Sequence, residues 1–213
     1  MGKTCTELFA GIDCTILGNA DDEVNGIAYR SDRVQPGDAF FCVVGMTTDG
    51  HSFAQDAIDR GAKVLVVERK VYLADATDVT EIVVKDTRKA MAAAAANFYD
   101  HPSKDLALVG ITGTKRQDHH DLPGRAHRAG SGEAHGRHRN RGHPHWRRGR
   151  EIGSTTPESP DLQQLFARMR DARCDVVAME VSSHALDLDR TWDAAFAVTA
   201  FSNLTQDHLD YHH

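Results

Sequence analysis

The sequence has 213 residues, of which 40% are hydrophobic, and a formal net charge of −6. This length is enough for one large or two small domains with cores of their own. No segment approaches the roughly 18 apolar residues that a membrane-spanning helix needs, and the N-terminus lacks the apolar stretch of a signal peptide. We therefore expect a cytoplasmic protein with no membrane partner.

The four cysteines, Cys5, Cys14, Cys42 and Cys174, are scattered and form no CxxC pair. In a cytoplasmic protein this pattern favours reduced, buried thiols over disulfides or a zinc site.

The first hundred residues alternate between strand and helix patterns. Apolar runs predict strands at residues 39–44, 63–67 and 81–84, and helical spacing predicts helices at residues 51–60 and 87–99. Gly61 suits the position after the first helix, and Asp86 suits the N-cap of the second. Strands that alternate with helices predict an α/β fold with a mostly parallel sheet.

The segment His101-Pro102-Ser103 is typical of a domain junction. Beyond it, apolar patterns predict a strand entering residue 110, a helix at 161–171 and strands at 175–179 and 196–201. We therefore expect two α/β domains, at residues 1–104 and 105–213.

The segment LVGITGT, residues 108–114, begins as a phosphate-binding loop. A buried strand that leads into a glycine turn and a helix N-terminus can hold phosphate with backbone N–H groups. The chain then continues Lys115-Arg116-Gln117-Asp118, with no glycine before the lysine and no serine or threonine after it. The loop is started but not completed.

Residues 115–150 differ sharply from the rest of the chain. They hold ten Lys and Arg residues against three acidic ones, a net +7, so the remaining chain carries −13. They also contain seven of the thirteen histidines and almost no apolar side chains. Such a composition predicts disorder. Two alternative interpretations are a natural His- and Arg-rich insert that binds metal or nucleic acid, and a plain linker.

Outside this window, five segments resemble in order and spacing the Mur ligases of peptidoglycan synthesis, above all the members that add the third amino acid of the stem peptide. The segments are YRSDRVQPGDAFFCVVGMTTDGH (29–51), LVGITGT (108–114), STTPES (154–159), MEVSSHALDLDR (179–190) and FSNLTQDHLDYH (201–212).

The family loop is Thr-Gly-Thr-Asn-Gly-Lys-Thr-Thr, so the break falls inside the ATP site that the resemblance implies. Residues 115–124 can be encoded by AAA CGG CAA GAC CAC CAC GAC CTA CCT GGT. One base later this string encodes Asn-Gly-Lys-Thr-Thr-Thr-Thr-Tyr-Leu, the missing loop. Residues 140–149 shift in the same way to Thr-Val-Gly-Thr-Arg-Ile-Gly-Asp-Gly, and the original frame returns by Glu151. We therefore hypothesise that residues 115–150 are a frameshifted window, caused by a lesion in the gene or an error in its sequence.

The resemblance also implies roles for particular residues. As catalytic residues and magnesium ligands it implies Glu180 and His208. As ATP-binding residues at the entrance of the loop it implies Gly110, Thr112, Gly113 and Thr114. As contacts to the uridine nucleotide it implies Tyr29, Ser31, Met46, Thr47 and Thr48. As contacts to the muramoyl peptide it implies Thr155, Thr156, Ser182 and Arg190.

In this resemblance, residues 1–104 form a UDP-muramoyl-peptide-binding domain, and residues 105–213 form part of a P-loop-type ATPase domain with a mostly parallel sheet. The implied activity is an ATP- and Mg²⁺-dependent amide ligase: ATP converts a carboxylate of UDP-N-acetylmuramoyl-L-alanyl-D-glutamate to an acyl phosphate, and an amino acid displaces the phosphate. A monomer without a nucleic-acid partner is expected.

The chain ends before the carbamylated lysine and the amino-acid-binding domain of the family, so we expect a fragment. The alternative function is a catalytically inactive fragment with at most weak binding of the UDP substrate, and we expect no tight ATP binding by the chain as it stands.

Overall fold

The structure is a computed structural model that describes residues 2–71, 78–113, 135–137 and 156–202. The chain divides into two compact units, Met1–Asp100 and His101–His213. The predicted window at residues 115–150 lies outside the described residues except for residues 135–137.

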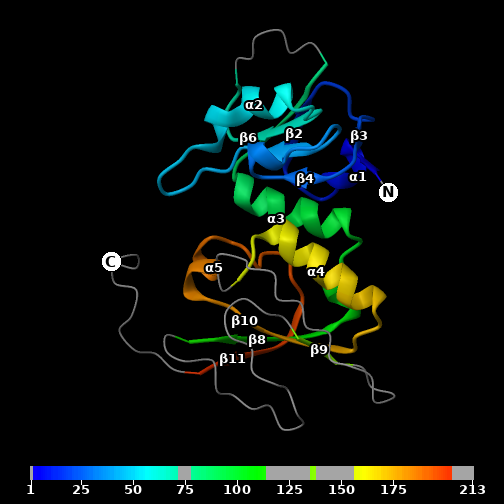
Figure 1. Cartoon of the computed structure of the whole chain (residues 1–213), viewed down its shortest axis with the longest axis vertical. Helices are drawn as coiled ribbons and strands as arrows, with labels where there is room; N and C mark the ends of the chain where they lie inside the picture. The colour runs from blue at the N-terminus through cyan, green and yellow to red at the C-terminus, as the bar shows by residue number, and fades with distance from the viewer. Residues whose placement is uncertain (1, 72–77, 114–134, 138–155, 203–213) are drawn as a thin grey trace. The chain divides into compact units, whose positions relative to one another are not determined.

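Unit 1 is built on a five-stranded sheet in the order β2-β7-β6-β5-β4 (Figure 1). Its strands are β2 (Cys14–Leu17), β4 (Ile27–Ala28), β5 (Ala39–Phe41), β6 (Val64–Val67) and β7 (Thr80–Val84). Strands β4 to β7 are parallel, as the sequence predicted, and β2 joins β7 in antiparallel orientation. A separate pair is formed by β1 (Lys3–Thr4) and β3 (Glu23–Val24).

Helices cover both faces of this sheet. They are α1 (Cys5–Leu8), α2 (Ala54–Asp59) and α3 (Thr87–Phe98), with short 3₁₀ helices η1 (Ser31–Arg33) and η2 (Gly50–Phe53). Along β5 the buried side chains alternate: Phe41 packs in the core cluster with Met91 of α3, whereas Phe40 packs in the cluster with Ala57 of α2. Burial on both faces explains the continuous apolar run at this strand.

The helix cap and the glycine turn predicted in unit 1 are present in the structure. Asp86 caps α3 by accepting hydrogen bonds from the N–H groups of Arg88 and Lys89. Gly61 follows α2 with a φ of +100°, a conformation that favours glycine. The predicted helix at 51–60 is wrong in its first turn, which is the 3₁₀ helix η2, since Asp49 accepts from the His51 N–H there.

Unit 2 contains a four-stranded sheet in the order β11-β8-β10-β9. The strands are β8 (Ala107–Thr112), β9 (His135–Arg137), β10 (Val176–Glu180) and β11 (Phe196–Phe201). Strands β8, β10 and β11 are parallel, and β9 pairs with β10 in antiparallel orientation. The helices are η3 (Pro102–Asp105), α4 (Ser159–Asp171) and α5 (Ser183–Asp187).

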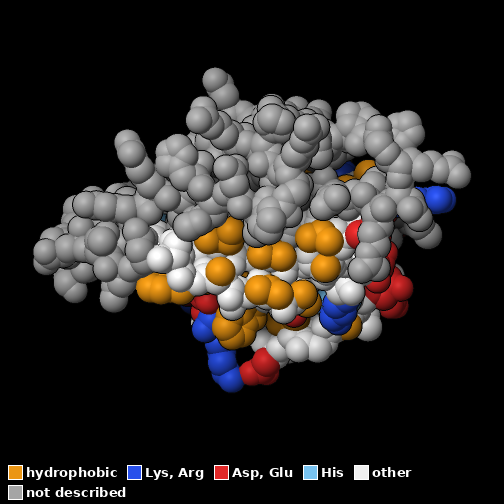
Figure 2. Space-filling view, turned by 90° about the horizontal axis from the view of Figure 1, so that it is seen from below, with side chains coloured by type: hydrophobic (Ala, Val, Ile, Leu, Met, Phe, Trp, Pro, Cys, Tyr) orange, Lys and Arg blue, Asp and Glu red, His pale blue; other side chains and the backbone are white. Residues whose placement is uncertain are grey.

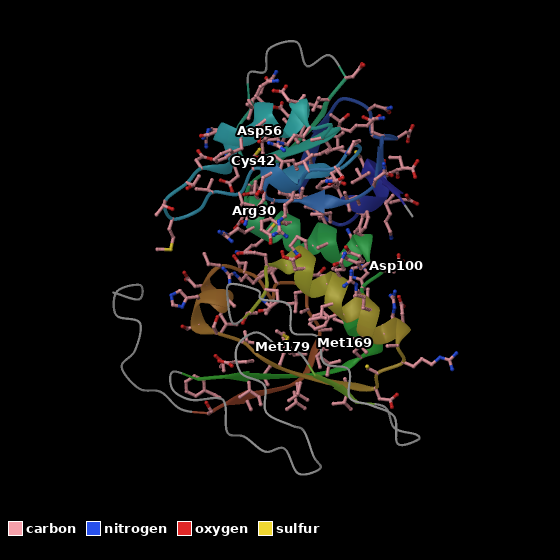
Figure 3. All side chains as sticks on the ribbon, in the orientation of Figure 1. Arg30, Cys42, Asp56, Asp100, Met169 and Met179 are labelled. Atoms are coloured by element: carbon pink, nitrogen blue, oxygen red, sulfur yellow. The ribbon has the colours of Figure 1, made fainter. Side chains whose placement is uncertain are left out.

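The core of unit 2 lies on one face of its sheet. Leu162, Phe166 and Met169 of α4 pack against Leu108 of β8 and Met179 of β10. Figure 3 labels the two methionines, which lie between α4 and β10. Figure 2 views the opposite side of this sheet, where hydrophobic side chains gather between atoms drawn in grey.

All four cysteines are free thiols; Cys5, Cys42 and Cys174 are buried as predicted, whereas Cys14 is only half-buried. Among the described helices, none combines the length and the apolar character that a membrane crossing requires.

Candidate functional site

Strands β4, β5 and β6 are parallel and therefore end at the same edge of the unit 1 sheet. Tyr29 and Ser31 follow β4, the loop with Met46, Thr47 and Thr48 follows β5, and Glu68 and Arg69 follow β6. Open α/β sheets bind ligands outside the carboxyl ends of their strands. The residues predicted to contact the uridine nucleotide thus lie at one edge where such a ligand can bind.

Residues 43–50 form a tight hairpin. Val44 and Asp49 pair as an antiparallel bridge, and the Gly45 N–H donates to the Thr48 carbonyl at 2.9 Å. At Gly50 a Cβ atom would lie 2.6 Å from the Val43 nitrogen, so only glycine fits. The hairpin presents Met46 at its tip with 72% of its surface exposed, which suits a ligand contact.

Asp49 and His51 anchor the base of this hairpin. The Asp49 carboxylate accepts from the His51 N–H at 3.0 Å, lies 2.6 Å from His51 Nδ1 and forms an ion pair with Arg69. These contacts, Arg69 first, hold the pKa of Asp49 below its usual range. His51 Nε2 in turn accepts from the Glu68 N–H at 3.1 Å, which places the ring proton on Nδ1.

Sequence reasoning missed this network. Its signal in the sequence is the string Asp49-Gly50-His51. The Asp49 side chain caps η2 and also contacts the imidazole ring of His51.

The hydroxyl of Ser31 is engaged by a protein carboxylate. It hydrogen-bonds with Asp56 of α2, labelled in Figure 3, and this bond, together with Arg60, lowers the pKa of Asp56. Arg60 Nε lies 3.0 Å from Asp56 Oδ1. A phosphate or sugar oxygen at Ser31 would therefore share the hydroxyl with Asp56. Tyr29 is half-buried and packs against the core cluster of the sheet.

In unit 2, the entrance of the predicted ATP loop is described as far as Gly113. Gly110 is buried within β8, and a Cβ atom there would lie 2.8 Å from the ring of Phe196, so close packing accounts for this glycine. The carbonyl of Thr112 accepts from the N–H and the hydroxyl of Ser202, at 2.8 and 3.1 Å. Thr114 lies outside the described residues.

Thr156 connects two segments at the end of β10. Its hydroxyl donates to the Glu180 carbonyl at 3.3 Å and accepts from the Ser182 N–H at 3.1 Å. Ser182 is the N-cap of α5, since its Oγ accepts from the Ala185 N–H. Thr156 is fully buried. The structure therefore brings together three of the predicted site residues, and Thr155 lies outside the described residues.

Arg190 completes this cluster. Its Nη1 donates to the Thr156 carbonyl at 2.9 Å, and its Nη2 lies 2.9 Å from Oε1 of Glu158. The side chains of Arg190 and Glu158 are 14% and 19% exposed, so the ion pair is largely shielded from water. Sequence reasoning missed Glu158, whose only signal is its place beside the Thr-Thr pair in STTPES.

Glu180 is the last residue of β10, at the carboxyl end of a central parallel strand. Magnesium prefers oxygen ligands and is often held by one or two carboxylates together with substrate phosphates. Glu180 fits that role, although within the described segments no three His, Cys, Asp or Glu side chains cluster as a metal site. The second predicted ligand, His208, lies outside the described residues.

The two units match two family models. Residues 23–99 match the Mur ligase family catalytic domain, and residues 131–213 match the Mur ligase middle domain. Residues 100–130, which include the interrupted phosphate loop, belong to neither match.

Similar proteins include UDP-N-acetylmuramoyl-L-alanyl-D-glutamate--2,6-diaminopimelate ligases from two Clostridium species. The C. perfringens protein is 39% identical over 96% of this chain and the C. botulinum protein is 42% identical over 96%. A solved structure of a ligase with the same name covers 100% of this chain with a TM-score of 0.68 and 19% identity, which shows a shared fold. MurF from Acinetobacter baumannii covers 98% with a TM-score of 0.62 and 16% identity.

The chain spans less than half of these relatives. It covers 42% and 43% of the two Clostridium proteins and 42% of each of the two solved chains.

Proposed function

This chain belongs to the Mur ligase family, and we propose that it forms the substrate-binding and nucleotide-binding part of an ATP-dependent amide ligase. The ligase adds the third amino acid to UDP-N-acetylmuramoyl-L-alanyl-D-glutamate in peptidoglycan synthesis. In this proposal the predicted domain at residues 1–104 holds the uridine nucleotide, and the predicted domain at residues 105–213 holds ATP and the muramoyl peptide. The reaction forms an acyl phosphate, which an amino acid then converts to an amide.

The observation that carries the proposal is the cluster of Thr156, Glu180, Ser182 and Arg190. These residues come from two separate segments of the chain, STTPES and MEVSSHALDLDR, and hydrogen bonds of Thr156 join them at the carboxyl end of β10. The Arg190 guanidinium at such an edge suits the carboxylates and phosphates of the substrate. Relatives of 39% and 42% identity carry a name that states the same substrate.

Each group supplies a distinct part of the chemistry. Glu180, with His208, would hold Mg²⁺, which offsets negative charge on transferring phosphoryl oxygens. Gly113 and Thr114 would start the loop that receives ATP phosphates. Arg190 is held by Thr156 and Glu158, so its guanidinium is fixed before a substrate carboxylate arrives. Pre-set cations of this kind stabilise developing charge without reorganisation.

The second candidate function is an inactive fragment with at most weak affinity for the UDP substrate. The observation that favours it is the missing loop: Arg116 and Gln117 stand where the family has Gly and Lys. In our proposal the phosphate loop is missing because residues 115–150 are read in a displaced frame, and the natural enzyme has the complete loop. Both candidates predict binding at the edge of β4, β5 and β6, and only the first predicts that restoring the frame restores ATP use.

The test measures phosphate release by the full-length gene product with the frame restored. We expect release only when ATP, Mg²⁺, UDP-N-acetylmuramoyl-L-alanyl-D-glutamate and an amino acid are all present, with diaminopimelate and lysine assayed side by side. A Glu180→Gln variant should lose this activity, whereas Asp21→Asn, an exposed change in unit 1, should keep it. An enzyme that folds and binds ATP but ligates neither amino acid contradicts the proposal.

A further inference from the structure

Thr156 is fully buried, and its hydroxyl group is already engaged by the protein. The hydroxyl accepts a hydrogen bond from the Ser182 N–H at 3.1 Å and donates one to the Glu180 carbonyl at 3.3 Å. A threonine hydroxyl has a single proton to donate, and here that proton goes to a backbone carbonyl. The resemblance implies that Thr156 contacts the muramoyl peptide, but a buried hydroxyl with these two bonds is better suited to holding the backbone.

The backbone around Glu180 is held on two sides. On one side β10 pairs with β8, where Glu180 is in register with Ile111 and the Val181 N–H donates to the Ile111 carbonyl at 2.9 Å. On the other side Thr156 binds the Glu180 carbonyl and the Ser182 N–H. The main chain that carries the candidate magnesium ligand is therefore fixed at the carboxyl end of the strand.

The carbonyl group of Thr156 holds a second functional side chain. It accepts from Nη1 of Arg190 at 2.9 Å, while Nη2 of Arg190 lies 2.9 Å from Oε1 of Glu158. Pro157 follows Thr156 and favours an extended backbone at that position, which limits the directions that this carbonyl can take. The segment 156–158 therefore fixes both ends of the guanidinium group.

In the sequence, helix α5 lies between the two points that Thr156 binds, and it follows β10 directly (Figure 1). Ser182 caps the first turn, since its Oγ accepts from the Ala185 N–H at 3.2 Å. After the last turn, the Arg190 N–H donates to the Ala185 carbonyl at 2.9 Å. The hydroxyl of Thr156 thus binds the residue before the helix, and its carbonyl binds the residue after the last turn. One residue closes a ring around α5.

We propose that Thr156 is a positioning residue, which holds the backbone of Glu180 and the guanidinium group of Arg190 at one spacing. This inference rests on the proposed function, in which Glu180 would hold Mg²⁺ and Arg190 would bind an anionic group of the substrate. Phosphoryl transfer depends on such spacing because its catalysis is mostly positioning and charge stabilisation. Glu158 is a second positioning residue, and it acts on Arg190 alone.

Substitutions separate the two groups of Thr156. Thr156→Val keeps the shape and the carbonyl but removes the hydroxyl, so it should loosen the backbone at Glu180 and leave Arg190 in place. Glu158→Gln should loosen only Arg190. Thr156→Ser keeps the hydroxyl and should behave as the parent does. The matched control is Thr80→Val, since the Thr80 hydroxyl is also buried and hydrogen-bonded, but lies in unit 1.

The first readout needs no catalysis. Hydrogen exchange of the Ser182 amide in the present chain should become about tenfold faster or more in Thr156→Val. It should keep the parent rate in Thr156→Ser, Glu158→Gln and Thr80→Val. If Thr156→Val does not fold, Thr156→Ala also lacks the hydroxyl and takes its place. Equal exchange in the parent and in the variant without the hydroxyl overturns the inference, and so does equally fast exchange in Thr156→Ser and Thr156→Val.

The second readout uses the full-length gene product with the frame restored. Thr156→Val should lower kcat by about 10- to 100-fold and raise the Mg²⁺ concentration that gives half the maximal rate, with little change in the KM for the UDP substrate. Glu158→Gln should instead raise that KM. If Thr156→Val raises the KM and leaves the Mg²⁺ dependence unchanged, Thr156 is a substrate contact and the inference is overturned. A parent enzyme that ligates neither amino acid contradicts the proposed function as well, whereas an active parent whose Thr156→Val variant keeps its kcat overturns this inference alone.

Discussion

His51 Nδ1 lies 2.6 Å from Oδ1 of Asp49. The ring continues the network inward, since its Nε2 accepts from the Glu68 N–H. The Glu68 carboxylate in turn accepts from the N–H and the hydroxyl of Thr87, the first residue of α3, at 2.9 and 2.8 Å. The exposed hairpin with Met46 at its tip is thereby joined to the sheet and to a helix, so its base is fixed.

Substitutions at His51 should separate the two halves of this network. His51→Asn can keep a donor toward Asp49 but leaves the Glu68 N–H without its acceptor. His51→Gln can keep an acceptor for the Glu68 N–H but loses the donor toward Asp49. Each should reduce the free energy of unfolding of unit 1 by about 1–3 kcal/mol, the usual cost of an unsatisfied buried group. His51→Ala should cost more than either. Urea denaturation measures the free energy of unfolding of each variant. If all three variants had the urea midpoint of the parent chain, the network would contribute nothing to stability.

Because of Asp49, the free energy of unfolding of unit 1 should decrease as the pH is lowered into the acid range. Its pKa is lowered from 3.8 in the folded state by Arg69 first and then by His51, so its contribution is fully present above the unfolded pKa. The contribution is lost as the pH falls through the folded pKa. Urea midpoints measured from pH 7 to pH 2 should fall less steeply for Asp49→Asn. The exposed control Asp21→Asn should retain the slope of the parent chain.

Local sequence patterns predicted the elements whose signals lie within a few residues. The strand at residues 196–201, the cap at Asp86 and the turn at Gly61 are all confirmed. The strand predicted at 39–44 ends at Phe41, because the chain then turns into the hairpin at Val44 and Asp49.

Features that depend on distant partners were not predictable in this way. Strand β2 was missed because four residues of alternating burial become a strand only through their pairing with β7. In the candidate site, the resemblance supplied Arg190, but its partner Glu158 lies in a different segment, STTPES, and nothing in either segment shows that the two side chains meet. Burial and pairing in three dimensions decide such contacts.

The Glu158–Arg190 pair should contribute to the stability of unit 2. Glu158→Ala leaves the Arg190 guanidinium largely buried without its carboxylate, so we expect a loss near the lower end of the about 3–5 kcal/mol seen for broken buried pairs. Asp105→Ala is the matched control, since Asp105 is 61% exposed beside Arg170 and such pairs contribute about 0–1 kcal/mol. Thermal unfolding of the two variants measures the difference. Equal melting temperatures would show that the first pair is not a stabilising contact.

The buried thiols should resist modification in the folded chain. Burial raises the pKa of Cys42 to about 12 and that of Cys5 to about 11, with a smaller effect of neighbouring carboxylates. Thiolates are the reactive form, so Ellman's reagent at pH 8 should label Cys42 and Cys5 only as the chain unfolds. Cys14, which is half-buried, should react first. Peptide mapping after brief labelling identifies the modified residues, and early labelling of Cys42 would contradict the described packing.

The chain as it stands should not bind ATP tightly. A phosphate loop works because consecutive N–H groups converge on the phosphates at a helix N-terminus, while lysine offsets their charge and a hydroxyl holds magnesium. Here Arg116 replaces the glycine that permits close approach of the backbone, and Asp118 adds a negative charge. The many basic residues nearby can attract nucleotide only in a way that salt screens. Isothermal titration with Mg-ATP at physiological salt should therefore show no saturable micromolar site, whereas a chain with Asn-Gly-Lys-Thr-Thr and the following helix restored should regain one. A stoichiometric, salt-resistant ATP site in the unrestored chain would falsify this account, because the remaining Gly113 and Thr114 would then suffice to hold the triphosphate.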